Sequence, residues 1–408
     1  MHPMSILMIV ENLFPYDVRV KKEADILKEF YNVTVIALKN KGSKFHEIND
    51  SIEIFRIPAI CSKTDIHNKF VHAVGYVCQY AWFSLMALVI FMITYIKRRY
   101  HIIHAHNPPD TLFFIGLIGK VFGIKYIYDH HDLSPELYLA KFSGKKDYLY
   151  QVLLLFEKYS CKVADKIITT NESYKKIEMN RDNIPSEKII IVRNDPLIDE
   201  FRYIYPGAEK QKHLKKNLLF VGSINQQDGL DVLLKALHYL VYILNEKNFR
   251  CYIVGDGDSF KESLLLAKRL KLDDYVYFTG LIFERKHVMK YYELADICLE
   301  PAPQNALNQN STFIKIMEYM ASHRPIVAFD LPESRYSAEG AALFVQPNNI
   351  EDFAHAIRRL LNNGELRFLL GKRGGRKILK NLNWRYAACN LLIAYSSIFE
   401  QTKDIYNF

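Results

Sequence analysis

Residues 310–330 read NSTFIKIMEYMASHRPIVAFD and predict a helix followed by a buried strand. Ser311 and Thr312 are residue types that cap helices, and from Phe313 the apolar residues recur at i, i+3, i+4 and i+7. Pro325 ends the helix, and an apolar strand follows. A helix that begins after a loop exposes free backbone N–H groups and the positive end of its dipole. The segment therefore predicts a phosphate site.

The same alternation of short apolar runs and amphipathic stretches extends over the chain and predicts an α/β fold with helices covering parallel sheets. In the first half we expect strands at residues 6–10, 33–37, 52–57, 102–105, 125–128, 166–169 and 189–192, with a helix at 20–30 between the first two. In the second half we expect strands at 217–221, 251–254, 276–279, 297–299, 326–328 and 343–345, with a helix at 230–244.

The weakest stretch between the halves is the lysine-rich segment 199–216, which is expected to be a linker. The chain of 408 residues then divides into an amino-terminal domain at 1–205, a second domain at 206–380 and a last helix within 381–408. Two nucleotide-binding-like domains facing each other across a cleft are the expected architecture. In such sheets ligands bind beyond the carboxyl ends of the strands.

Charge and cysteine usage exclude several classes of protein. The net charge of +9 is spread over both halves without the basic arm that nucleic-acid binders often carry. Nucleic acid is therefore not expected, whereas nucleotide phosphates and an anionic membrane surface fit. The six cysteines are scattered without a Cys-x-x-Cys pair, so neither a zinc site nor a disulfide framework is predicted. The first residues, MHPMSILMIVENLF, lack a basic region followed by a long apolar run, so we expect a cytoplasmic protein.

Residues 71–96 carry no Asp, Glu, Lys or Arg, and Lys97, Arg98 and Arg99 follow them. The segment is long enough to span a membrane. Expected strands of one sheet lie on both sides of it, however, and a single span would separate them. Two interpretations remain: a helix buried in the first domain, or a helix in the membrane interface whose basic end, up to residue 99, meets anionic headgroups at the inner face.

Two small-residue turns follow strands in the second half, and both would let the backbone approach a ligand closely. The candidate binding residues in these turns are Gly222, Ser223, Asn225, Gly255 and Gly257. Asp256 and Asp258 lie in the second turn, but acidic turns after strands are common, so no metal is expected.

Lys315 and Glu318 are three residues apart on the expected helix and so project on the same side. The lysine could offset phosphate charge while the carboxylate accepts hydrogen bonds from ribose hydroxyls. The alternative is an ordinary i, i+3 salt bridge on a solvated face.

The chain resembles the family-4 retaining glycosyltransferases, the group 1 glycosyl transferases of GT-B fold. In the second half the segments VGSINQQDGLDVLLKA, CYIVGDGD, VYFTG, ADICLEP and NSTFIKIMEYMASHRPIVAFD carry the likeness. In the first half HAHNPPDTLFF, YDHHDLSPE and KIIIVRND agree. The resemblance implies transfer of a sugar from a UDP- or GDP-sugar to an acceptor with retained anomeric configuration. It also implies that no metal or other cofactor is needed, and that the last helix crosses back onto the first domain.

Carried over by position, the resemblance makes Glu318 the glutamate that binds the nucleotide ribose, whereas the first glutamate of the family's pair falls on Asn310. The family places an arginine and a lysine on the diphosphate where this chain has Ser223 and Asp228. The residues that could replace these cations are Lys315, Arg193 and Arg324, of which the helix favours Lys315.

In the first domain the resemblance puts the family's active-site histidine, which contacts the transferred sugar, at His131; the alternative is a structural histidine in a polar loop. Weaker candidates at the end of another strand are His104 and His106. Asp17 and Arg19, in the loop after the first strand, are expected to face the cleft and to meet acceptor or phosphate.

The expected function is therefore sugar transfer to a saccharide or lipid-linked acceptor in polysaccharide or glycoconjugate synthesis. A non-catalytic nucleotide-sugar-binding subunit and a GT-B epimerase are the alternatives, because the first glutamate and both cations are altered. A dinucleotide-dependent oxidoreductase is disfavoured, since no Gly-x-Gly-x-x-Gly follows the first strand.

Overall fold

The computed structural model describes residues 4–60, 69–141, 145–202 and 215–399, with the side chains of 69–73 left undescribed. These residues form two α/β units. The first comprises Met1–Asn194 together with Ala387–Phe408, and the second comprises Asp195–Tyr386. Most of the expected linker, 203–214, lies outside the described residues.

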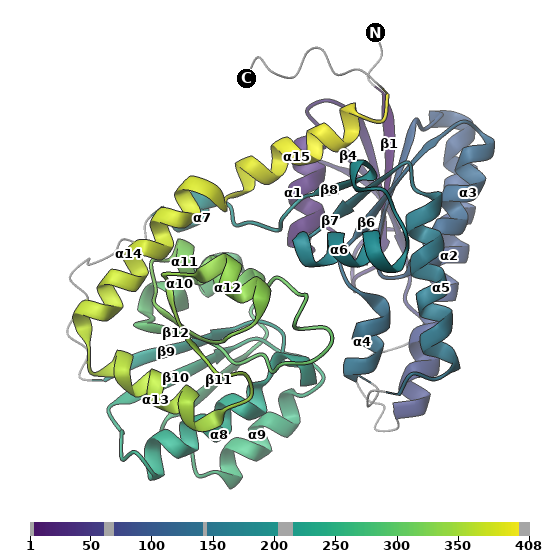
Figure 1. Cartoon of the computed structure of the whole chain (residues 1–408). Coiled ribbons are helices and arrows are strands. Elements are labelled where there is room, and N and C mark those ends of the chain that lie inside the picture. The colour runs from purple at the N-terminus through teal and green to yellow at the C-terminus, as the bar shows by residue number, and fades with distance from the viewer. Residues whose placement is uncertain (1–3, 61–68, 142–144, 203–214, 400–408) are drawn as a thin grey trace. The chain divides into compact units, whose positions relative to one another are not determined.

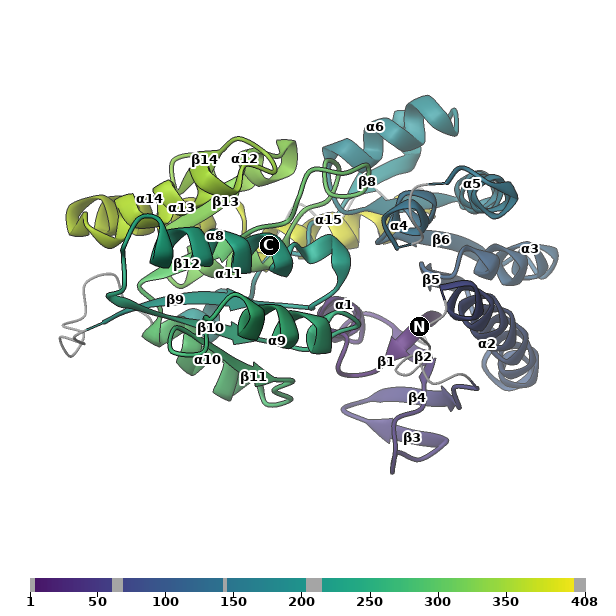
Figure 2. The same ribbon diagram turned by 90° about the horizontal axis from the view of Figure 1, so that it is seen from below.

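An eight-stranded sheet forms the centre of the first unit, in the order β3-β4-β2-β1-β5-β6-β7-β8 (Figure 2). Its strands are β1 (Ser5–Leu13), β2 (Asn32–Leu38), β3 (His46–Asn49), β4 (Ile52–Ile57), β5 (Ile102–His106), β6 (Lys125–His130), β7 (Lys166–Thr169) and β8 (Ile189–Ile191). All pairs are parallel except β3 with β4. Because parallel strands are covered on both faces, β1 and β5 are almost wholly buried.

Helices cover both faces of this sheet. The helices of the unit are α1 (Val18–Leu27), α2 (Lys69–Arg98), α3 (Phe113–Val121), α4 (Ser134–Lys141), α5 (Tyr148–Val163) and α6 (Glu172–Arg181), with short 3-10 turns η1 (Asp110–Leu112) and η2 (Ser186–Lys188). Helices α2, α3 and α5 lie on one face, whereas α1 and the end of α15 (Trp384–Ser396) lie on the other (Figures 1 and 2). The predicted return of the last helix to the first unit is confirmed: Tyr395 is fully buried there, and its hydroxyl lies 2.8 Å from Nδ1 of His104.

Helix α2 is the long apolar segment, and only one side of it is covered. Phe83, Ala87 and Phe91 are fully buried against the sheet. Leu85 and Ile93, by contrast, are 57% and 62% exposed. Among the described residues, Val74–Arg98 is long and apolar enough to cross a membrane, and 33% of its most apolar window is buried. Helix α2 therefore packs on the sheet along one side and leaves its other side exposed.

The second unit contains an all-parallel six-stranded sheet in the order β11-β10-β9-β12-β13-β14. Its strands are β9 (Lys216–Val221), β10 (Phe249–Val254), β11 (Val276–Gly280), β12 (Ile297–Glu300), β13 (Ile326–Phe329) and β14 (Ala342–Val345). Its helices are α7 (Ile198–Phe201), η3 (Gln226–Asp228), α8 (Leu230–Tyr242), α9 (Phe260–Arg269), α10 (Arg285–Leu294), α11 (Ile314–Ala321), α12 (Pro332–Ala338), α13 (Ile350–Leu361) and α14 (Gly364–Asn381).

Two apolar clusters hold this sheet. Side chains of α8, α9 and α13 pack on one face, and those of α10 and α11 on the other. Every expected strand of both halves is present, so the predicted fold of two parallel α/β domains is confirmed. Strand β3 is the one strand of the described residues that was not expected.

Candidate functional site

The carboxyl ends of β9 and β10 carry the two glycine turns of the second unit, and the turns meet backbone to backbone. Gly222 and Gly255 have φ of +149° and +144°, which other residues rarely adopt. A Cβ on Gly255 would lie 1.8 Å from the carbonyl oxygen of Gly222, and one on Gly257 would lie 2.5 Å from that of Ile224. Glycine is required here because the two loops leave no room for a side chain.

Asn225 ties these turns together. Its Oδ1 accepts a hydrogen bond from the backbone N–H of Asp258 at 3.1 Å, and its own N–H donates to Oδ2 of Asp228 at 3.1 Å. Ser223, directly after Gly222 in the first turn, is exposed. The predicted residues of the two turns are thus brought together at one edge of the sheet.

Lys315, on α11, reaches the same edge. Its Nζ lies 3.3 Å from Oε2 of Glu300 and 3.5 Å from Oδ1 of Asp228, and 4.5 Å from the ring centre of Phe220. A Cβ on Gly222 would lie 3.3 Å from Cε of the lysine, so the ammonium adjoins the first glycine turn. No hydrogen bond from Nζ is present among the described residues, although the side chain is only 10% exposed.

Burial and charge shift the pKa values of this cluster in a consistent way. Burial lowers the pKa of Lys315, but the carboxylates of Glu300 and Asp228 outweigh burial and hold that pKa above its usual range. Burial raises the pKa of Glu300 to about 7, opposed by the lysine. The lysine therefore stays charged at neutral pH, while Glu300 titrates near neutral pH.

Glu318 lies one turn further along α11 and has different partners. Its Oε1 accepts from Arg285 at 2.5 Å, and its Oε2 accepts from the hydroxyl of Tyr292 at 2.5 Å. Arg285 also donates to Glu200 at 2.9 Å. Lys315 and Glu318 do not pair with each other, so the alternative of an i, i+3 salt bridge is wrong.

The start of α11 differs from the expectation. The N-cap residue is Phe313, and Ser311 and Thr312 do not cap the helix. The hydroxyl of Ser311 donates to the carbonyl of Leu307 at 2.9 Å, and that of Thr312 lies 3.4 Å from Glu333. The hydroxyl of Ser311 thus bonds within the turn that precedes the helix, whereas that of Thr312 points to a carboxylate of α12. Nδ2 of Asn310 likewise donates to a backbone carbonyl of that turn, at 2.9 Å.

Two of the proposed substitute cations have other surroundings. Arg324 donates to the backbone carbonyls of Tyr292 and Glu293, both at 3.1 Å, and is buried. Arg193 is buried at the end of the first unit. Of the two candidates in the second unit, Lys315 is the one that adjoins the glycine turns.

In the first unit, His131 lies in the loop after β6 at the surface of a buried polar cluster. Its Nε2 is 2.8 Å from Oδ2 of Asp129, 3.2 Å from Nδ1 of His106 and 3.0 Å from Nε of Arg19. Oδ1 of Asn107 accepts from the backbone N–H of His131 at 2.6 Å and so holds the loop. His131 retains 16% exposure of its side chain, so it can reach a ligand.

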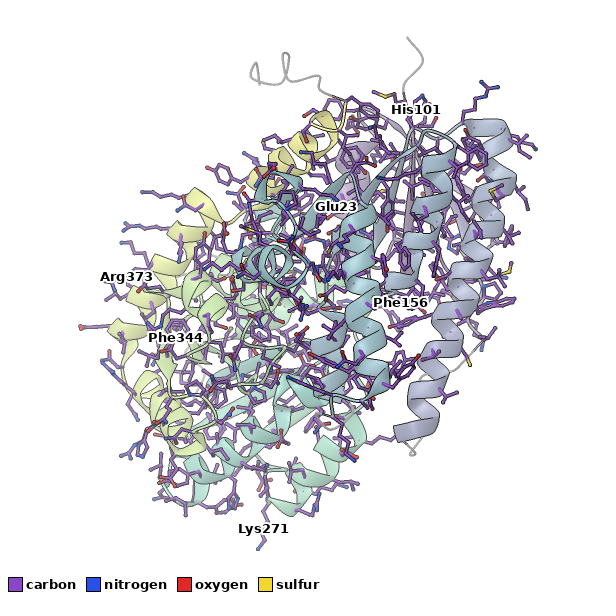
Figure 3. All side chains as sticks on the ribbon, turned by 45° about the vertical axis from the view of Figure 1, so that its right-hand side comes forward. Glu23, His101, Phe156, Lys271, Phe344 and Arg373 are labelled. Atoms are coloured by element: carbon purple, nitrogen blue, oxygen red, sulfur yellow. The ribbon has the colours of Figure 1, made fainter. Side chains whose placement is uncertain are left out.

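Behind His131 are Glu23, His104, His106 and Asp129, all fully buried, whose donor atoms lie within 4.8 Å of one another (Figure 3 labels Glu23). Arg19 contacts both carboxylates, at 2.8 Å from Asp129 and 3.1 Å from Glu23. Burial raises the pKa of Asp129, but Arg19 and the neighbouring histidines together outweigh burial and hold that pKa well below its usual range. The guanidinium thus already supplies a cation to a set of groups whose number and spacing would otherwise suit a metal ion.

The position of Arg19 corrects one expectation. The arginine is 5% exposed, and its guanidinium binds carboxylates and the carbonyl of Val192. Arg19 therefore lies in the interior of the first unit instead of facing a cleft. The sequence reasoning also missed Arg285, Tyr292 and Glu300, the partners of the two charged residues on α11. Glu300 does stand at the predicted end of a strand, which is a signal that could have identified it.

Comparison with known proteins gives two family matches. Residues 26–194 match Glycosyltransferase Family 4, and residues 215–363 match Glycosyl transferases group 1. An uncharacterized glycosyltransferase of Methanocaldococcus jannaschii is 22% identical over 315 residues, which cover 74% of this chain and 76% of the relative.

Solved structures share the fold. Sucrose-phosphate synthase from Thermosynechococcus elongatus has a TM-score of 0.75 at 19% identity, covering 97% of this chain and 99% of that one. Anabaena HepE, in complex with UDP-glucose, has a TM-score of 0.71 at 14% identity, covering 97% of this chain and 100% of that one.

Proposed function

Because the chain belongs to the group 1, family-4 glycosyltransferases of GT-B fold, we propose that it transfers a hexose from a UDP- or GDP-sugar to a saccharide or lipid-linked acceptor with retention of configuration. The observation that carries the proposal is the juxtaposition of Gly222, Gly255 and the Lys315 ammonium at one edge of the second sheet. Such turns present backbone N–H groups to phosphate oxygens, and the lysine supplies the opposing charge. HepE, a structural neighbour, binds UDP-glucose, which supports a nucleotide-sugar donor here.

In this proposal Glu318 accepts hydrogen bonds from the ribose hydroxyls. Arg285 and Tyr292 hold its two oxygens in place, and each carboxylate oxygen can accept a further bond. Asn310, at the position of the family's first glutamate, offers an amide to the sugar instead of a charge. His131 contacts the transferred sugar from the first unit.

The reaction then needs no separate strong base. The bond from the anomeric carbon to the diphosphate oxygen breaks, and a bond to the acceptor oxygen forms on the same face. The acceptor proton passes to the departing diphosphate. The protein supplies orientation and electrostatic stabilisation. We propose that this occurs without a metal ion, with Lys315 taking the charge of the diphosphate.

Thermal unfolding across a panel of UDP- and GDP-sugars tests the donor. A ligand that binds only the folded state at about 100 times its Kd stabilises by about 2.7 kcal/mol, so the correct donor raises the Tm. Adding a chelator should leave that shift unchanged. A flat response to every UDP- and GDP-sugar would overturn the proposal.

The charges around Lys315 favour one alternative function, a non-catalytic subunit that binds a nucleotide sugar. Glu300 and Asp228 together offset the positive charge of Lys315, and Ser223 adds none. A site without net positive charge fits a subunit that binds a nucleotide sugar without transferring it. Mixing donor with acceptor saccharides and analysing the products separates the two: released UDP with a new glycoside supports transfer, an altered nucleotide sugar indicates an epimerase, and unchanged donor indicates binding alone.

We further propose that the protein works in polysaccharide or glycoconjugate synthesis on the cytoplasmic side of the membrane, held there by α2. Val77, Leu85, Val89, Ile93 and Ile96 leave 41–81% of their area exposed along the helix. Its basic end would meet anionic headgroups. Co-sedimentation with anionic vesicles is expected, and a Leu85→Glu/Ile93→Glu double variant should stay in the supernatant. Equal sedimentation of both proteins would refute this role of α2.

A further inference from the structure

An apolar pocket of about 310 Å³ opens in the first unit between α2, α4 and α5. Its walls include Val77 and Ala81 of α2, Leu137 of α4, and Val152, Leu153 and Phe156 of α5. Figure 3 labels Phe156, which projects from α5 on the side of α2. The volume lies at the lower end of the range for ligand pockets, about 300–1,000 Å³. Two other features of the pocket indicate what it holds.

The first feature is its inner end, which adjoins the loop of His131. Asp110 lines the pocket, and its Oδ1 accepts from Nδ2 of Asn107 at 3.0 Å. Oδ1 of the same Asn107 holds the backbone of His131. Oδ2 of Asp110 is buried and has no hydrogen-bond partner among the described residues, and burial raises the pKa of this carboxyl. A polar group of a ligand would satisfy it.

The second feature is the rim, where Lys141 stands. Its Nζ lies 3.3 Å from the hydroxyl of Tyr76 and 4.9 Å from the centre of that ring, and it forms no ion pair with a described residue. Val77, which lines the pocket, belongs to the exposed apolar side of α2. The pocket is therefore apolar along its length, cationic at its rim and polar at its inner end.

We infer that this pocket binds the hydrocarbon chain of an anionic, lipid-linked acceptor, with the anion near Lys141. The inference rests on the proposed function, and it narrows the acceptor from a saccharide or lipid to an amphiphile. An apolar chain leaves water for the pocket, and the exposed side of α2 is continuous with the entrance. A free sugar would leave the apolar walls unused.

The test is calorimetric titration with alkyl phosphates of increasing chain length, below the concentration at which they form micelles. Affinity is expected to rise about fourfold for each buried methylene until the pocket is full. Leu153→Trp fills the pocket and should abolish that dependence. Leu155→Trp is the matched control, because Leu155 lies on the same helix, is 48% exposed and does not line the pocket. Circular dichroism establishes that both variants are folded.

A further variant, Lys141→Met, should weaken the binding of an alkyl phosphate while leaving that of the alkanol of equal length unchanged. Affinity that does not depend on chain length, or inorganic phosphate that binds as tightly as the alkyl phosphates, would overturn the inference. So would equal effects of the two tryptophan variants.

The Tm shift with nucleotide sugars reports on the second unit and keeps the two proposals separate. A shift without chain-length dependence refutes the pocket alone. Chain-length dependence without a shift supports the pocket as an amphiphile site and refutes the donor proposal.

Discussion

Lys315→Met deletes the ammonium beside Glu300 and Asp228 while keeping much of the apolar side chain. At about pH 8 the Glu300 carboxyl, whose pKa of about 7 includes the lowering by Lys315, is mostly ionised in the native protein. Without the ammonium its pKa rises and the carboxyl takes up a proton, which adds about 1.4 kcal/mol at this pH to the loss expected at lower pH. At about pH 5.5 Glu300 carries a proton in the folded protein, so the loss falls to that of the Asp228 pair and the contact with the Phe220 ring, about 1–2 kcal/mol together.

Urea unfolding followed by circular dichroism at the two pH values measures this difference. Lys290→Met is the matched control, because Lys290 is exposed on α10. Adding Glu300→Gln to Lys315→Met should remove the extra loss at the higher pH, and the double-mutant cycle gives the coupling. A loss below about 1 kcal/mol at both pH values, or no recovery in the double variant, would refute the account of this cluster.

Three further predictions concern single residues. Gly255→Ala should destabilise by more than about 2 kcal/mol in urea, because its Cβ would lie 1.8 Å from a backbone oxygen; Gly340→Ala, which has a positive φ but whose Cβ would meet only Arg373 Cδ at 4.0 Å, should lose less. Asp129→Asn should cost about 3–5 kcal/mol in the same assay, because it removes a charged partner of the buried Arg19, and a loss within error would contradict that pairing. Glu300 has a folded pKa raised from 4.5 to about 7, so its stabilising effect is complete below about pH 4.5 and is lost as the pH rises through about 7; Glu300→Gln should flatten the dependence of unfolding free energy on pH over that window, and an unchanged slope would count against it.

The strands could be predicted because buried parallel strands are nearly continuous apolar runs, as in Ile6–Val10. β3 could not be, because it is an antiparallel edge strand, largely exposed, whose sequence HEIN carries little apolar signal. Helix α11 starts one residue after the expected Phe313, and neither Ser311 nor Thr312 is its N-cap, because Ser311 donates to Leu307 in the preceding turn and Thr312 contacts Glu333 of α12.

The binding turns could be located from the sequence, but their charge balance could not. Asp228 stands at a position where the family has a lysine. In the sequence alone, this carboxylate would be expected to repel a phosphate. In the structure it pairs with Lys315, which is distant in sequence. Similarly, His104 and Asp129 come from neighbouring strands whose order no local pattern reveals, so the contacts of Asp129 with both His104 and Arg19 could not be predicted.

The burial of Tyr395 against His104 also constrains the order in which the protein is made. The first unit is interrupted by the whole of Asp195–Tyr386, so its interior is incomplete when residue 194 leaves the ribosome. About 200 further residues must be synthesised before Tyr395 is available, roughly 10–40 s at ~5–20 residues per second. During that interval the second unit is itself being synthesised, and the side of the first sheet that α15 covers stays open. We expect that stage to be the one at which the nascent chain most needs chaperones.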